Sequence, residues 1–241
     1  AIIPVKHESE RVKNKNFRNF YKNFSLLEIK IKQLKLSKAF DKIIISSNSF
    51  HAKKLAKKYN CKFVKRVARY SNNITSWSEV ITNVVKTSNL KKNDIVSWCH
   101  VTSPLFNDYK KAVIKFMKFK KKGYDSLVAV NKFNGFLLNE RLYPVNYNWG
   151  KWHDYSQNLP NYYTVNGALF ISTVSSILDL NYLIGKKPIH FLCSDKVSID
   201  IDTEIDFEIA KIIFKMANEK KSRFYFFCHG RKVQDSKGSS F

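Results

Sequence analysis

Two aspartates near the carboxyl end of the chain are the residues best suited to chemistry. Asp200 and Asp202 stand two apart in the run SIDIDTEID, residues 198–206. Side chains two apart on an extended backbone point to the same side, so the two carboxylates are expected to lie together. Such a pair suits Mg²⁺, which keeps several waters and takes further oxygen ligands from phosphates. Taken alone, the pair could instead be two solvated aspartates in front of a helix.

The residues around this pair predict a corner between a strand and a helix. Residues 197–201 have the pattern of a strand. Thr203 and Asp206 have the spacing of a capping box, which predicts a helix that begins just after the pair. Apolar residues then continue at helical spacing, namely Ile205, Ile209, Ile212, Ile213 and Met216.

A basic loop follows the first apolar run, residues 1–5. It reads KHESERVKNKN over residues 6–16. Lys6, Arg11 and Lys15 could neutralise a triphosphate, and Ser9 together with backbone amides could hydrogen-bond its oxygens. Loops that follow the first strand of an α/β sheet often hold phosphates. The same loop could also be an ordinary solvated segment.

Short apolar runs alternate with helical patterns along the chain, which predicts how these loops are positioned. The expected strands are 1–5, 43–45, 62–65, 94–100, 126–130, 168–171 and 197–201. The expected helices are one capped by Ser25, then 51–59, 76–88, 108–122 and the one after Thr203. This alternation predicts an α/β fold with a mostly parallel sheet covered on both faces, in which ligands bind at the carboxyl ends of the strands.

The charge of the chain could point to a different function. The net charge is +24 over 241 residues, which would suit a nucleic-acid-binding protein that neutralises phosphates. The lysines are scattered, however, and no RNA-binding or helix-turn-helix signature accompanies them. We therefore interpret them as solvated surface with no specific nucleic-acid partner, although a positive field speeds the arrival of polyanions.

The sequence also predicts the compartment. No run of about 18 or more apolar residues is present, which argues against a membrane span, and no signal peptide is visible. The four cysteines form no C-x-x-C pair and are too few for a disulfide framework in a chain of this length. We expect reduced thiols in a cytoplasmic protein.

Five motifs, in order, resemble the acylneuraminate cytidylyltransferases, the CMP-sialic acid synthetases. The family's opening IPARGGSKRIPNKN is IPVKHESERVKNKN at residues 3–16, and its RPAELASDTAS is RVARYSNNITS at 66–76. Its LQPTSPL is CHVTSPL at 99–105, and its QxLPxxFRPNGAIYI is QNLPNYYTVNGALFI at 157–171. Its metal motif SIDIDTxxD matches residues 198–206 without a gap.

The resemblance implies a three-layer α/β/α, Rossmann-like fold related to the nucleotide-diphospho-sugar transferases. It implies a single domain over residues 1–230, a polar tail over 231–241 and a homodimer. In the family, the segment that corresponds to residues 133–165 reaches across to the other subunit. That role fits a stretch which reads as irregular and aromatic in this sequence.

The resemblance also implies CMP transfer from CTP to a sialic-type sugar with Mg²⁺ as cofactor. Asp202 would hold the ion, with Asp200 directly or through water, and Lys15 would act beside them. The implied nucleotide-binding residues are Lys6, Ser9, Arg11, Lys15, Asn16, Arg66 and Ser76. The implied sugar-binding residues are His100, Thr102, Ser103, Gln157, Asn166 and Gly167.

Several positions depart from the family pattern. His7 and Glu8 replace a Gly-Gly pair, so the backbone must approach the phosphates differently. His100 stands where the family has Gln, and Ser156 and Thr164 stand where it has Arg residues near the sugar carboxylate. These departures favour a related acidic sugar, of the legionaminic, pseudaminic or octulosonic type. A nucleotidyltransferase for another nucleotide, or a basic nucleic-acid-binding protein without catalysis, remains the alternative.

Overall fold

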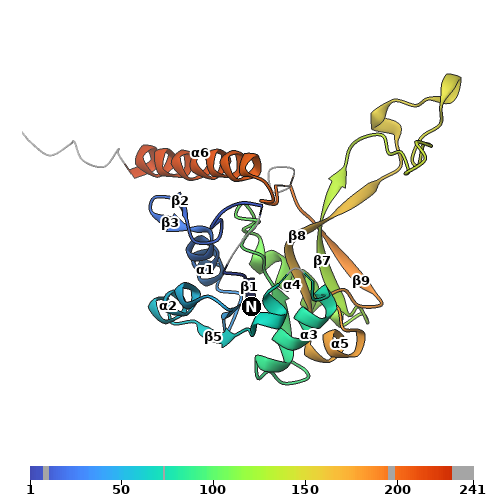
Figure 1. The fold of residues 1–241 in the computed structure, drawn as a ribbon. Coiled ribbons are helices and arrows are strands. Elements are labelled where there is room, and N and C mark those ends of the chain that lie inside the picture. The colour runs from blue at the N-terminus through green and yellow to red at the C-terminus, as the bar shows by residue number, and fades with distance from the viewer. Residues whose placement is uncertain (8–10, 73, 195–198, 230–241) are drawn as a thin grey trace, which may run out of the picture.

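The fold is described by a computed structural model that covers residues 1–7, 11–72, 74–194 and 199–229. Its main sheet has the strand order β5-β4-β1-β6-β8-β7-β9 (Figure 1). The strands are β1 (Ile2–Val5), β4 (Ile44–Ser47), β5 (Lys62–Lys65), β6 (Ile95–Trp98), β7 (Ser126–Phe133), β8 (Tyr162–Thr173) and β9 (Pro188–Leu192). All neighbours pair in parallel except β8, which runs antiparallel to both β6 and β7. The predicted mostly parallel sheet is confirmed.

Most helices begin at a side-chain cap, whereas α4 begins without one. They are α1 (Leu26–Ser37), α2 (Phe50–Lys58), α3 (Trp77–Thr87), α4 (Tyr109–Lys120), α5 (Val174–Leu180) and α6 (Glu204–His229). Ser25 and Glu28 form a capping box at α1, and Ser76 and Glu79 form another at α3. Each box satisfies backbone N–H groups that the first turn of a helix leaves unpaired. A short ribbon of β2 (Asn19–Tyr21) and β3 (Phe24–Ser25) lies before α1.

Two apolar cores, one on each face of the sheet, make the fold three-layered. Ile3 and Val5 of β1 face one core, whereas Ile2 faces the other, as the two-residue period of a strand requires. The first core contains apolar residues of α1, α2, α4 and α6. The second contains residues of α3 and α5. The predicted three-layer α/β fold is therefore confirmed.

A long hairpin projects from the body of the protein (Figure 1). We call residues 134–161, which join β7 to β8, the arm. The arm carries two short 3₁₀ turns, η2 (Gly150–Trp152) and η3 (Ser156–Asn158). At its base the pairing of β7 with β8 shifts between Val128 and Val130, so that β8 bulges between Val165 and Phe170. The hairpin bends at this bulge, and its pairing continues outward to Phe133 and Tyr162, where the arm begins.

Several expected elements differ from the structure. The expected strand at 197–201 is wrong for Ile199, Asp200 and Ile201, which lie in an irregular segment; residues 197 and 198 lie outside the described residues. Strands β7 and β8 extend into the stretch expected to be irregular, because cross-strand pairing continues to Phe133 and Tyr162. Helix α5 and strand β9 were not predicted.

The last helix turns a different face inward from the one its pattern predicts. Phe207 and Ala210 are buried, whereas Ile205, Ile209, Ile212 and Met216 are exposed. The expected tail at 231–241 lies outside the described residues. In the part of the chain that the structure describes, none of the helices is long and apolar enough to cross a membrane. Cys61, Cys99 and Cys193 are free thiols.

Candidate active site

A polar cleft of about 520 Å³ opens where the loops after β1, β5 and β6 meet the segment before α6. Its basic and acidic groups come from positions up to 196 residues apart, yet they face one space. The lining residues are Pro4, Val5, Lys6, Arg11, Lys15, Asn16, Arg66, Trp77, His100, Val101, Thr102, Asp200 and Asp202. The cleft thus brings together most of the residues that the sequence proposed for nucleotide and metal binding.

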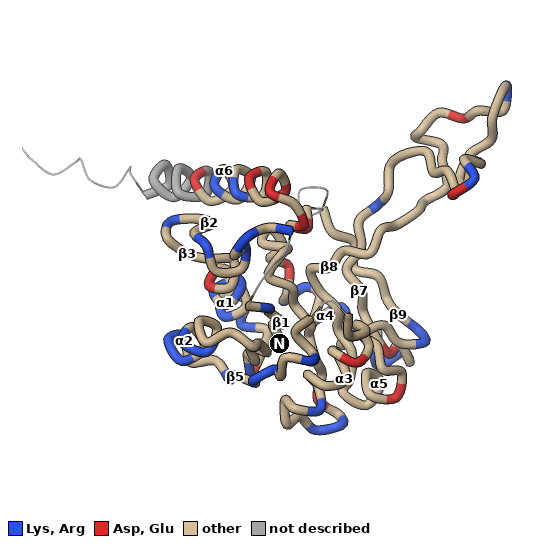
Figure 2. The backbone as a smooth tube through the Cα atoms, in the orientation of Figure 1, with Lys and Arg blue, Asp and Glu red and all other residues tan. Residues whose placement is uncertain are grey.

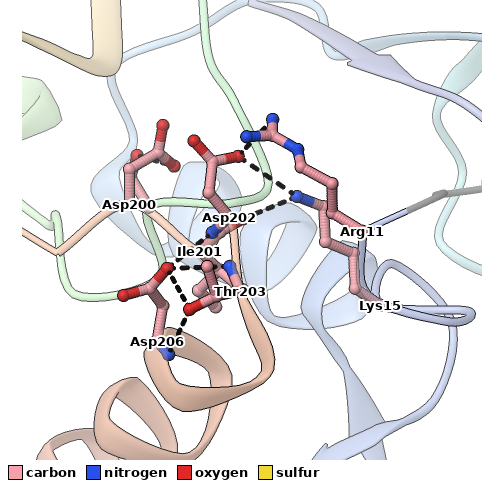
Figure 3. A network of polar contacts seen from close by, with 8 residues as sticks. Arg11, Lys15, Asp200, Ile201, Asp202, Thr203 and Asp206 are labelled. Atoms are coloured by element: carbon pink, nitrogen blue, oxygen red, sulfur yellow. Dashed lines mark hydrogen bonds and ion pairs between the residues drawn. The ribbon is translucent and has the colours of Figure 1, made fainter.

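The acidic corner is fixed by the start of α6 (Figure 3). Asp206 Oδ2 accepts hydrogen bonds from Thr203 N at 2.8 Å and from Asp202 N at 3.1 Å. Thr203 Oγ1 in turn accepts from Asp206 N at 3.2 Å, which completes the predicted capping box. Hydrogen bonds from Thr203 lower the pKa of Asp206, so this carboxylate is ionised and committed to the cap. Asp200 and Asp202 are therefore the carboxylates left to face the cleft.

Two cations of the loop after β1 approach Asp202. Arg11 Nη2 donates to Asp202 Oδ1 at 2.7 Å, and Lys15 Nζ lies 3.7 Å from the same oxygen. Lys15 is 8% exposed, and its Nζ donates to the carbonyl of Ile201 at 2.5 Å. Burial lowers the pKa of Lys15, and the charges of Asp202 and Asp200 oppose that effect. The basic loop and the acidic corner thus form one site, as Figure 3 shows.

The acidic corner fits a magnesium ion bound together with phosphates. Asp200 and Asp202 both line the cleft, and the Ser103 hydroxyl donates to Asp200 Oδ1 at 3.4 Å. Within the described ranges, no group of three or more His, Cys, Asp or Glu side chains could hold a metal. An ion here would therefore need oxygen ligands from water and a substrate, which is how Mg²⁺ is usually held.

Arg66 places a buried positive charge against the cleft. It is 3% exposed, and its Nη2 donates to the carbonyl of Val5 at 2.7 Å. Its Nε is buried without a hydrogen-bond partner, as is Oδ1 of the neighbouring Asn16. Burial lowers the pKa of Arg66 to about 10. An unsatisfied buried guanidinium is costly, so an anion in the cleft would be a favourable partner.

The beginning of the basic loop is tied to neighbouring segments. Lys6 Nζ donates to the carbonyl of Asn72 at 2.7 Å, which ties the loop after β1 to the segment before α3. His7 N donates to Asn48 Oδ1 at 2.9 Å, and the His7 ring contacts Ser49. His7 therefore points toward the start of α2, whereas Glu8, the other residue that replaces the Gly-Gly pair, lies outside the described residues. Ser9 lies outside the described residues.

Four of the predicted sugar-binding residues lie at or beside the cleft, and a fifth, Asn166, is buried in a hydrogen bond with Asn131. His100 and Thr102 line the cleft, Ser103 lies just behind it against Asp200, and Gly167 faces His100 and Asp200. Asn166 is buried, and its Nδ2 donates to Asn131 Oδ1 at 2.5 Å.

Two predicted contacts lie elsewhere. Gln157 lies exposed in η3 on the arm and does not line the cleft, so its sugar contact stays a prediction. The Ser76 hydroxyl is engaged in the cap of α3, and its nucleotide contact likewise stays a prediction.

Three residues of the site were missed from the sequence. Trp77 lines the cleft and directly follows Ser76. Trp98 contacts His100, and the two-residue spacing of a strand could have revealed this. Lys30 lies fully buried behind the cleft, where its Nζ donates to the carbonyl of Ser103 at 2.9 Å and to the Tyr109 hydroxyl at 2.6 Å. Lys30 is one of three lysines in α1, so the sequence gives little signal of such a role.

Solved structures share this architecture. The chain aligns with a CMP:2-keto-3-deoxy-manno-octonic acid synthetase complexed with CTP over 90% of this chain and 98% of that one, with a TM-score of 0.61 and 10% identity. A 4-diphosphocytidyl-2C-methyl-D-erythritol synthase from Anaerococcus prevotii aligns over 89% and 95%, with a TM-score of 0.62 and 13% identity. The fold is that of the nucleotidyltransferases.

Sequence comparison narrows this class. A family model described as cytidylyltransferase matches residues 1–190, and the chain belongs to this family. A pseudaminic acid cytidylyltransferase from Campylobacter jejuni is 28% identical over 91% of this chain and 97% of the relative. An N-acylneuraminate cytidylyltransferase from Escherichia coli O18:K1:H7 is 26% identical over 96% of this chain and 55% of the relative. A CMP-N,N'-diacetyllegionaminic acid synthase from Campylobacter jejuni is 27% identical over 90% and 95%.

Proposed function

We propose that the protein transfers CMP from CTP to the anomeric hydroxyl of a nonulosonic acid, an acidic nine-carbon sugar, and releases pyrophosphate. The observation that carries this proposal is the approach of Asp202 to Arg11 and Lys15 within one cleft of a cytidylyltransferase. It is supported by relatives that span nearly the whole chain and are named for pseudaminic, N-acylneuraminic and legionaminic acids.

The basic residues of the cleft would hold the triphosphate. Lys6, Arg11, Lys15 and Arg66 together place four cations on the lining. Positive charges at fixed positions stabilise the charge that develops on the phosphate oxygens, and they cost little reorganisation during the reaction.

Asp200 and Asp202 would hold Mg²⁺, which when bound supplies charge neutralisation at the phosphates. The sugar oxygen would form a bond to the α-phosphorus while the bond from that phosphorus to the pyrophosphate oxygen breaks, and the hydroxyl proton is released. Holding the two substrates in line is expected to provide much of the rate enhancement.

The arm would form a homodimer contact in the cytoplasm, where we propose that the protein works. It carries large apolar side chains that are more than half exposed: Leu142 67%, Tyr143 59%, Trp149 52%, Trp152 67% and Tyr155 75%. So many exposed rings on one projecting segment are unusual for a monomer and favour a protein partner. A second copy of the chain is the partner that the arm suits in this proposal, and three free thiols fit a reducing compartment.

Pyrophosphate release tests the proposed function. Purified protein is incubated with CTP, UTP, GTP or ATP and with pseudaminic, legionaminic, N-acetylneuraminic or octulosonic acid, with Mg²⁺ or with EDTA. We expect turnover with CTP and at least one nonulosonic acid, and its loss with EDTA. Turnover confined to another nucleotide, or to the octulosonic acid, would contradict the proposal. Absence of turnover with tight, salt-dependent binding of nucleic acid would favour the alternative.

That alternative finds little support in the distribution of charge. Figure 2 shows Lys and Arg spread over helices, loops and the arm and not gathered into one stripe. Nucleic-acid-binding surfaces usually cluster their basic residues along one face or groove.

A further inference from the structure

Trp98 determines where the proton of the His100 ring lies. Trp98 is the last residue of β6 and is fully buried. Its indole Nε1–H donates to His100 Nε2 at 3.0 Å. An indole nitrogen only donates, so His100 Nε2 must keep its lone pair free to accept. The ring is then neutral and carries its single proton on Nδ1.

The surroundings of the ring fix its orientation. The rings of Trp77 and Phe170 approach it edge-on, with centroids 5.5 Å and 6.2 Å from that of His100. Burial opposes protonation and lowers the pKa of His100 to about 4. The ring is therefore clamped between aromatic side chains as well as by the hydrogen bond from Trp98.

The protonated nitrogen packs against Gly167 beside a carboxylate oxygen. A Cβ on Gly167 would lie 3.1 Å from His100 Nδ1 and 3.2 Å from Asp200 Oδ2, closer than ordinary van der Waals contact, so a glycine at this position lets both atoms approach. His100 and Asp200 also line the cleft. One polar group of a substrate in the cleft can therefore meet a donor and a carboxylate.

We propose that His100 is a fixed Nδ1–H donor, positioned by Trp98, which with Asp200 binds one hydroxyl of the acceptor sugar in the cleft. A hydroxyl oxygen accepts from Nδ1–H, and its proton is donated to Asp200 Oδ2, so both partners are satisfied. The carboxylate of the sugar would not fit at this point, because it has no proton to donate and its charge would be repelled by that of Asp200. This inference rests on the proposed function and deepens it by assigning Trp98 as a positioning residue.

The same geometry excludes His100 as the general base of the reaction. Nδ1 already carries a proton, and the lone pair of Nε2 is occupied by the Trp98 indole. His100 would therefore contribute binding and orientation of the acceptor sugar, and its effect is expected in the kinetics of that substrate and not in those of CTP.

The tautomer can be measured without any substrate. ¹⁵N-labelled histidine in the substrate-free protein, recorded near pH 8, distinguishes a protonated Nδ1 from a protonated Nε2. The His100 signal is identified by its loss in His100→Gln. We expect the proton on Nδ1 in the wild type and a changed tautomer ratio in Trp98→Phe, with the other five histidines of the chain unchanged. A proton on Nε2 in the wild type would overturn the inference while leaving the proposed function intact.

Substitutions of His100 test whether its effect on the sugar comes from its two hydrogen bonds or from its size. The Gln side chain in His100→Gln can accept from Trp98 with its carbonyl and donate with its amide, whereas the Met side chain in His100→Met can do neither. We expect kcat/KM for the sugar within about threefold of wild type for Gln and reduced about tenfold or more for Met, the scale of one lost hydrogen bond. KM for CTP should stay unchanged in both. Equal losses in both variants would contradict the donor role.

Gly167→Ala provides a test in which His100 and Trp98 themselves are not substituted. Its methyl group would lie 3.1 Å from His100 Nδ1 and 3.2 Å from Asp200 Oδ2, so both side chains must shift, while the backbone at Gly167 has no left-handed φ that would strain an alanine. We expect kcat/KM for the sugar to fall about tenfold or more, with unchanged KM for CTP. Wild-type kinetics of Gly167→Ala would contradict a shared contact of His100 and Asp200 with the sugar.

Discussion

Arg11 Nη2 lies 2.7 Å from Asp202 Oδ1, which joins two residues 191 positions apart across the cleft. Both side chains are largely exposed, at 68% and 46%, so the pair contributes little to stability. The pair instead indicates which ligands the cleft would bind. Arg11 and Lys15 both approach Asp202. We expect a bound triphosphate to take over the two cations, and a bound metal ion to take over the carboxylate.

Asp202→Asn should reduce turnover by about 100-fold or more, because the substitution removes a charge from the proposed metal-binding pair while keeping nearly the same shape. Steady-state pyrophosphate release at saturating CTP and sugar measures the loss. Asp179→Asn is a matched control, since Asp179 is exposed on α5 and away from the cleft. Near-normal turnover of a folded Asp202→Asn protein would remove Asp202 from the mechanism.

Arg66→Lys should raise KM for CTP about tenfold, although the charge is retained. A lysine cannot reproduce the guanidinium fork, which bonds the carbonyl of Val5 while Arg66 lines the cleft. Arg69→Lys, three residues later and exposed in η1 (Ala68–Ser71), should leave KM for CTP unchanged. If both variants bind CTP like the wild type, Arg66 has only a structural role.

Lys30 should make stability rise with pH in the alkaline range. Burial lowers the pKa of Lys30 from 10.5 to about 8, so between these values the unfolded chain binds more protons than the native protein. The free energy of unfolding therefore increases as pH rises through this window. Between about pH 7.5 and 9.5, the wild type should gain about 2 kcal/mol relative to Lys30→Met.

Urea unfolding of both proteins at several pH values measures that difference, and the comparison cancels the titration of groups common to the two chains. A difference that is constant across the range would mean that Lys30 titrates as an ordinary exposed lysine does.

Replacing Trp149 and Trp152 together by Ser should convert the proposed dimer to a monomer, because it removes two large apolar contacts from the arm. Sedimentation velocity at micromolar concentration gives the mass. Leu36→Ser with Phe50→Ser is the matched control, since these side chains are 81% and 68% exposed on the body. A wild-type protein that already sediments as a monomer would refute the dimer.

The sequence predicted those elements whose signals are local, such as the residues that cap a helix. Ser25 and Ser76 start helices as predicted, because capping is decided within a single turn. The helix α6 was predicted, but the spacing of its isoleucines did not reveal which face is buried, since Ile205 and Phe207 lie on the same helix and only packing against the body selects between them. Strand β9 lies at the sheet edge and alternates buried Ile189 with exposed neighbours over only five residues, which gives a weak signal.

The site was predictable where its groups belong to short motifs. Asp200, Asp202 and Lys15 were found in this way, and the structure brings them to one cleft. Trp98 and Lys30 were missed because their roles depend on contacts with His100 and Ser103, and a buried residue in a strand or helix has the same pattern whether or not it touches a site. The position of Gln157 on the arm likewise depends on the path of the hairpin.

The bulge in β8 between Val165 and Phe170 has a mechanical consequence. Gly167, against which His100 and Asp200 lie, sits within this bulge, at the corner where the hairpin bends away from the sheet. A change in the tilt of the arm would therefore shift Gly167 and the side chains of His100 and Asp200 that pack on it, because β8 both carries Gly167 and leads into the arm. We expect that a compound bound to the arm would alter the turnover of the sugar without entering the cleft.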